Sequence, residues 1–118
     1  MREPTFYVLA ALLRGPLHGY AIMKRAEELS GGRVRLATGT LYTALDRLTA
    51  EGHVQLVSEE IVGGRPRRTY GLTESGSAAL RAEAVRMAEA AELVIGRTRE
   101  TTGPPAPSAA VGMRTRLP

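Results

Sequence analysis

The sequence predicts a mainly α-helical chain with one small β-hairpin. Three apolar segments with helical spacing occupy the first half of the chain, and two β-prone segments around a Gly-Gly turn follow them. A long segment with a heptad-like apolar seam comes last. Three helices and then a hairpin is the order of a winged helix-turn-helix, to which this chain adds a C-terminal dimerisation helix.

The boundaries of these parts follow from composition and periodicity. We expect a winged-helix domain over residues 1–72, a dimerisation helix over residues 73–100 and a disordered tail over residues 101–118. The tail is rich in Pro, Gly, Ser, Thr and Ala and has no apolar periodicity, which is typical of segments without a packed core.

The first two predicted helices are Pro4–Leu13 and Gly19–Leu29. The first is apolar almost all round, so it must be covered on more than one side, by its own domain and, we expect, by a second subunit. The second carries apolar residues at helical spacing along one face only. A Gly-Pro pair ends the first helix and a Gly-Gly pair ends the second.

The third predicted helix spans Gly39–Glu51, with Thr38 as its N-cap and Gly52 as its C-cap glycine. Its apolar residues recur at i, i+3, i+4 and i+7. The opposite face is small and polar, so it can approach the edges of base pairs closely. This face comprises Gly39, Thr43, Asp46 and Ala50, with Tyr42 on one side and Thr40 and Arg47 on the other.

The predicted hairpin has Val54–Ile61 and Arg67–Leu72 as its strands and Gly63–Pro66 as its turn. Its tip is strongly basic, because it carries Arg65, Arg67 and Arg68. Such a tip favours contact with phosphates or with a minor groove.

The last predicted helix is capped by Thr73. An apolar seam with the spacing 4, 3, 4, 3 runs along it, formed by Leu80, Ala84, Met87, Ala91 and Val94. A small three-helix core cannot cover so much apolar surface, which favours packing against a second copy of the chain. We expect Leu9 and Leu13 of the first helix to assist. Packing within one chain is the simpler alternative.

Composition excludes several function classes. The chain has no Cys, two His and one Asp, which leaves little for a disulfide framework, a metal site or acid–base catalysis. We therefore expect no enzymatic activity, no metal and no cofactor.

The apolar runs of the predicted folded part are too short to span a bilayer, and Arg-Gly-Pro rather than a cleavage site follows the first of them. We expect a cytoplasmic protein that does not bind membranes.

The charge balance points to a polyanion, although weakly. The chain has 16 basic and 12 acidic residues, a net charge of +4. Codon bias in a GC-rich genome explains an arginine excess equally well, so the position of the charge has to decide. Clustered arginines on the hairpin favour double-stranded DNA.

We predict that DNA contacts come from the third helix, the hairpin and the second helix. The predicted residues are Thr38, Gly39, Thr40, Tyr42, Thr43, Asp46, Arg47, Lys24, Arg65, Arg67 and Arg68. Three of these have an alternative: Arg47 could pair with Asp46 or Glu51, Asp46 could hold Arg47 in place instead of contacting a base, and Lys24 could belong to a solvated face.

Three motifs in this order resemble the PadR family of bacterial transcriptional regulators. They are LLRGPLHGYAIMKRAEE (Leu12–Glu28), GTLYTALDRLTAEGHV (Gly39–Val54) and GGRPRRTYGLTESG (Gly63–Gly76). They look like the family's entry to the second helix, its recognition helix and its basic hairpin with the start of the last helix. The chain departs from the family pattern at Thr43, where Pro is frequent, and at His53, where an aliphatic residue is common.

The resemblance implies the family's smaller architecture, a homodimer held by the last helix, and repression of a nearby operon that a small ligand commonly relieves. We expect a sequence-specific DNA-binding regulator on a pseudo-palindromic operator. The alternative is a winged-helix module that binds proteins and not DNA. A surface of that kind would more often expose apolar anchors than three arginines.

Overall fold

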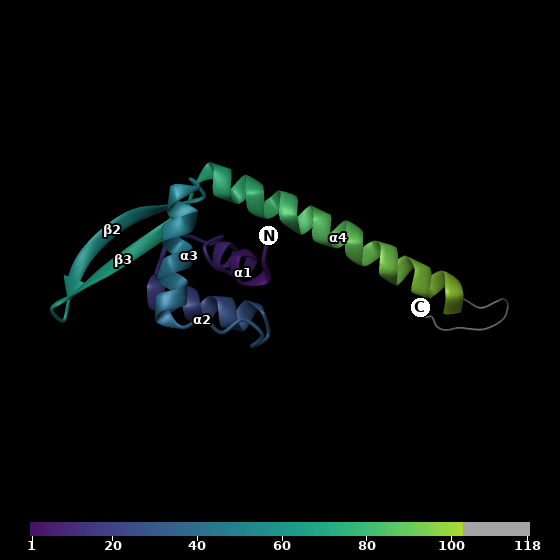
Figure 1. Cartoon of the computed structure of the whole chain (residues 1–118), viewed down its shortest axis with the longest axis horizontal. Coiled ribbons are helices and arrows are strands. Elements are labelled where there is room, and N and C mark those ends of the chain that lie inside the picture. The colour runs from purple at the N-terminus through teal and green to yellow at the C-terminus, as the bar shows by residue number, and fades with distance from the viewer. Residues whose placement is uncertain (103–118) are drawn as a thin grey trace. The chain divides into compact units, whose positions relative to one another are not determined.

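The computed structural model describes the backbone of residues 1–102 and the side chains of residues 1–96 (Figure 1). The elements are α1 (Glu3–Ala11), β1 (Leu17–His18), α2 (Gly19–Leu29), α3 (Thr38–Ala50), β2 (Val54–Val62), β3 (Arg65–Leu72) and α4 (Glu74–Thr102). This is the expected mainly helical winged-helix fold with a β-hairpin. The predicted tail lies outside the described residues, apart from its first two, which end α4.

The chain divides into two compact units. The N-terminal unit comprises Met1–Glu83, and the C-terminal unit begins at Ala84. The first turns of α4 therefore belong to the N-terminal unit, and the rest of this helix belongs to the other. None of the described helices is long and apolar enough to cross a membrane.

The α-helices confirm most of the expectations drawn from periodicity. The bounds of α2 are those predicted, and the stripe Leu41, Leu45 and Leu48 is buried. The expected N-cap of α3 was wrong: Ala37 holds that position, and Thr38 is already the first helical residue. Ala37 has an extended backbone, and its carbonyl accepts the first helical hydrogen bond, from the Leu41 N–H at 2.9 Å.

The sheet is longer at its tip than expected and contains one more strand. Gly63 and Gly64 alone form the turn, both with positive φ, which suits a two-residue hairpin loop. Arg65 and Pro66 therefore belong to β3. The extra strand, β1, pairs antiparallel with β3, so the order is β1-β3-β2. Two residues are too few to show a period, which is why β1 was missed.

The core lies among α1, α2, α3 and the base of the sheet. Its fully buried large side chains are Val8, Leu9, Ile22, Leu41, Leu45, Leu48 and Val54. Leu80, from the start of α4, joins this cluster and is 4% exposed. This cluster fixes the relative positions of α3 and the sheet.

The start of α4 is tied to the end of α3. The Thr73 hydroxyl accepts a hydrogen bond from the Gly76 N–H at 2.9 Å, which confirms the predicted cap. The Thr73 N–H donates to the His53 carbonyl at 3.1 Å. Gly76 lies so close to that carbonyl that an added Cβ would overlap it. Gly52, with φ of 81°, follows α3 as predicted.

Candidate nucleic-acid interface

The outward face of α3 is exposed along its length. All residues of α3 that were predicted to contact DNA are exposed except the half-buried Tyr42; the exposed ones are Thr38, Gly39, Thr40, Thr43, Asp46 and Arg47. No side chain caps the N-terminus of α3, so the N–H groups of its first turn remain available. A small, polar helix face with unpaired backbone N–H donors at its N-terminus can enter the groove of a polyanion and bind its anionic groups.

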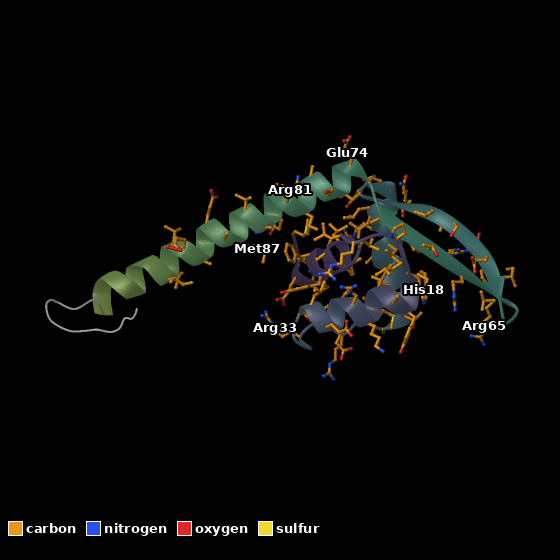
Figure 2. The ribbon with its side chains drawn as sticks, turned by 180° about the vertical axis from the view of Figure 1, so that it is seen from behind. His18, Arg33, Arg65, Glu74, Arg81 and Met87 are labelled. Atoms are coloured by element: carbon orange, nitrogen blue, oxygen red, sulfur yellow. The ribbon has the colours of Figure 1, made fainter. Side chains whose placement is uncertain are left out.

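A basic hollow lies on one side of this face, between the start of α2 and the wing (β2, β3 and their turn). We call it the wing hollow; it measures about 320 Å³. Its lining residues are His18, Gly19, Tyr20, Tyr42, Val62, Arg65, Pro66 and Arg67. Figure 2 shows His18 at the start of α2 and Arg65 near the tip of the wing. No Asp or Glu lines this hollow, so its charge is positive.

The three wing arginines are not equivalent. Arg65 and Arg67 have no ion-pair partner among residues 1–96. Arg68 instead donates to the Glu59 carboxylate at 2.9 Å, and this hydrogen bond and charge raise the pKa of Arg68 above its usual value. A phosphate would have to compete with Glu59 for Arg68, whereas it meets the other two directly.

Tyr42 joins the core to the wing hollow. Its side chain is half-buried, and its ring centroid lies 6.4 Å from that of buried Tyr70. Its hydroxyl lies against Gly19, where an added Cβ would overlap it. Because Gly19 has no side chain, the Tyr42 hydroxyl can lie against the first residue of α2, and both residues line the wing hollow.

Arg47 is held within its own chain. Its guanidinium lies 3.4 Å from the Glu51 carboxylate and donates to the Thr5 hydroxyl at 3.0 Å. Thr5 is a buried residue of α1, 42 positions away. One of the two alternatives for Arg47, the pairing with Glu51, is therefore present.

A second hollow lies on the opposite side of α3, toward α1. We call it the α1 hollow; it measures about 700 Å³. It is lined by Arg2, Pro4, Thr5, Val8, Leu36, Gly39, Thr40, Thr43, Ala44 and Arg47. Sequence reasoning missed Arg2 and Thr5, because neither carries a local signal that relates it to α3.

The remaining predicted residues are scattered. Lys24 is exposed on α2 and lines a different hollow, together with the acidic Glu27 and Glu28. Of the residues predicted for a dimer interface, Leu9 and Leu80 are buried in the core of their own chain. The others are exposed: Leu13, Ala84, Met87, Ala91 and Val94. No cluster of potential metal ligands occurs within the described part of the chain.

Comparisons with known proteins agree with this geometry. A family model described as the transcriptional regulator PadR-like family matches residues 8–82. The structure of Bacillus subtilis PadR in complex with operator DNA is 29% identical, with a TM-score of 0.63, over 72% of this chain and 48% of that one. A PadR-like transcription factor from Bacteroides fragilis is 25% identical, with a TM-score of 0.65, over 78% and 86%.

One curated protein adds a local match. It is an uncharacterized 37.1 kDa protein in transposon TN4556 of Streptomyces fradiae, and it is 51% identical over 49 residues. These residues make up 42% of this chain and 14% of the transposon protein. The chain thus spans only a small part of that protein, and about half of Bacillus subtilis PadR.

Proposed function

The chain belongs to the PadR-like family of transcriptional regulators, a family of transcription factors rather than enzymes, and on this premise we propose how it binds its operator. Two copies bind a pseudo-palindromic duplex, with one α3 of the dimer in each of two successive major grooves. The wing follows the phosphate backbone beside each α3.

One observation carries this proposal: the small, exposed face of α3 lies directly beside the carboxylate-free wing hollow. Base edges in the major groove are read by side chains on such a face, and phosphates are held by cations beside it. We assign the first task to Thr43 and Asp46, and the second to Arg65 and Arg67. Asp46 repels phosphate, but its carboxylate can accept from a cytosine amine.

The experiment is a salt titration of binding to the duplex upstream of the gene and to a scrambled duplex. Arg65→Ala and Arg67→Ala should weaken both complexes alike and reduce the salt slope by about one for each phosphate that the variant no longer binds. Arg68→Ala is the matched control on the same strand, with a smaller expected change because Glu59 already holds that guanidinium. Asp46→Ala should reduce the difference in affinity between the upstream duplex and the scrambled duplex.

The proposal fails if the wild-type chain binds neither duplex at low salt, which is the outcome expected of a protein-binding module. It also fails if the wing variants change sequence preference while the α3 variants change only the salt slope. That result would reverse the assigned roles.

We further propose that the dimer forms through the C-terminal unit. Its part of α4 exposes large apolar side chains: Val85, Met87, Leu93, Val94 and Ile95 are each at least 41% exposed in the single chain. Burying such surface contributes roughly 25 cal/mol per Å². A second copy offers the same seam and is the partner that heptad-like spacing favours. Light scattering of the wild-type chain at micromolar concentration should give the mass of two chains.

Regulation is proposed from the family resemblance and the operator complex of the similar Bacillus subtilis protein. Binding next to a promoter represses the adjacent operon, and a small ligand relieves this repression. A reporter fused to the upstream region should rise in activity when the gene is deleted. Unchanged or lower activity would indicate that the protein is no repressor of that promoter.

A further inference from the structure

We propose that Arg2 contacts the second phosphate strand of the operator, on the side of α3 opposite the wing. This inference rests on the proposed DNA binding and extends it to the start of α1. The observation behind it is that α3 is flanked by two hollows, and that each contains at least one arginine and no acidic residue.

The dimensions of DNA bring a phosphate strand close to each side of α3. A major groove is about 12 Å wide, and an α-helix with its side chains is about 10–12 Å across. A helix that fills the groove therefore has one phosphate strand along each of its sides. The residues of the wing hollow lie on one side of α3 and can contact only one of these strands. The α1 hollow is open beside Gly39, Thr40 and Thr43, along the other side of the same face.

Arg2 is the available cation of the α1 hollow. Its side chain is exposed, and no residue of the described part of the chain forms an ion pair with it. Arg47, the other arginine there, is already engaged by Glu51 and Thr5. The neighbouring acid, Glu3, forms an ion pair with Arg33 and leaves Arg2 without a competing carboxylate.

The backbone around Arg2 is held in place on both sides. The amino group of Met1 lies 3.7 Å from the Glu83 carboxylate, within the N-terminal unit. On the other side, Glu3 begins α1 and carries its ion pair to Arg33. Only the Arg2 side chain has to become ordered when it meets a phosphate, which favours the contact.

The test compares Arg2→Ala with Arg14→Ala in the full-length chain. Arg14 is an exposed arginine beyond the other end of α1 and lines neither hollow, so it controls for a general loss of charge. On the upstream duplex, Arg2→Ala should reduce the salt slope by about one per protomer, and Arg2→Lys should restore most of it. Arg14→Ala should leave the slope near the wild-type value. The thermal midpoint of all three variants should stay near that of the wild type.

A second measurement identifies the strand. Methylphosphonate linkages, which carry no charge, are placed one at a time along each strand of the duplex. Within one half-site, the position or short run of positions contacted by Arg2 should lie on the strand opposite the one that Arg65 contacts in that half-site. There the uncharged linkage should weaken wild-type binding and leave the affinity of the Arg2→Ala variant almost unchanged, and the two-fold axis repeats the pattern on the other strand of the second half-site.

If Arg2→Ala and Arg14→Ala behave alike while Arg65→Ala still flattens the slope, the contact by Arg2 is refuted and the proposed function stands. The same holds if Arg2→Ala weakens binding without changing the slope, because that would be a structural effect. If no variant and no wild-type chain binds DNA, the proposed function itself fails.

Discussion

Leu80 and Met87 lie two helical turns apart on α4, in the same predicted seam, and yet their surroundings differ. Leu80 is 4% exposed and packs in the core of the N-terminal unit, whereas Met87 is 41% exposed in the C-terminal unit. The predicted seam is therefore two different surfaces. Its beginning completes the winged-helix core, and its continuation is exposed in the single chain, where the proposed dimer would cover it.

The largest expected effect concerns the stability of the N-terminal unit. Leu80→Ala removes a buried side chain from a close-packed cluster and should lower the free energy of unfolding by about 2–5 kcal/mol. Urea denaturation followed by circular dichroism measures this decrease. A decrease as small as that of an exposed-site variant outside the seam, such as Leu29→Ala on α2, would mean that Leu80 contributes little to this core.

Met87→Glu should act on assembly instead. A methionine fully buried between subunits contributes about 1.5–3 kcal/mol, and a symmetric dimer contains it twice. We therefore expect the dissociation constant to rise by at least 100-fold, which corresponds to about 3 kcal/mol. Sedimentation velocity at several concentrations should show monomers with helical content close to that of the wild type. Glu92→Gln on the same helix is the control, and dimers that persist in Met87→Glu would place the interface elsewhere.

Gly76→Ala tests the close approach of the start of α4 to the residues that follow α3. The added Cβ would overlap the His53 carbonyl, so α4 must move away from the end of α3. Overpacking of this kind lowers the free energy of unfolding by about 1–3 kcal/mol. Gly96→Ala is the matched control, because only a flexible glutamate side chain lies within 4 Å of its added Cβ. Thermal melts of both variants measure the difference, and equal midpoints would contradict the close approach at His53.

Leu80 and Met87 also show what sequence patterns can and cannot predict. Periodicity located α2 and the buried leucine stripe of α3, because a face that is apolar at helical spacing must be covered by something. It could not say what covers the face, so Leu80 and Met87 looked equivalent.

In the candidate site too, local features were predictable from the sequence and contacts between distant residues were not. The wing arginines and the α3 face follow from local motifs. The contact of Arg47 with Thr5 joins residues 42 positions apart, and only the tertiary fold brings them together. Likewise, the distinction between Arg68 and its neighbours depends on the register that places Glu59 opposite it. Neither contact leaves a signal in local composition or spacing.

The smallest expected effect is a pH dependence confined to the N-terminal unit. Burial raises the pKa of Tyr70 above its usual value near 10, and the positive charge of Arg68 opposes this only in part. The native phenol thus holds its proton more tightly than the unfolded one. Stability should be complete below about pH 10 and should decrease as the pH rises through the native pKa, because unfolding then releases a proton.

Urea midpoints between about pH 8 and 11 test this prediction with Tyr70→Phe. The variant removes the titrating group and keeps the ring, so its midpoint should fall less steeply than that of the wild type above pH 10. Tyr20→Phe is the control for loss of a tyrosine hydroxyl, because Tyr20 is 66% exposed and lies outside the core. If Tyr70→Phe instead follows the wild-type profile, the buried phenol of Tyr70 is not the group responsible, and the alkaline decrease in stability arises from another part of the chain.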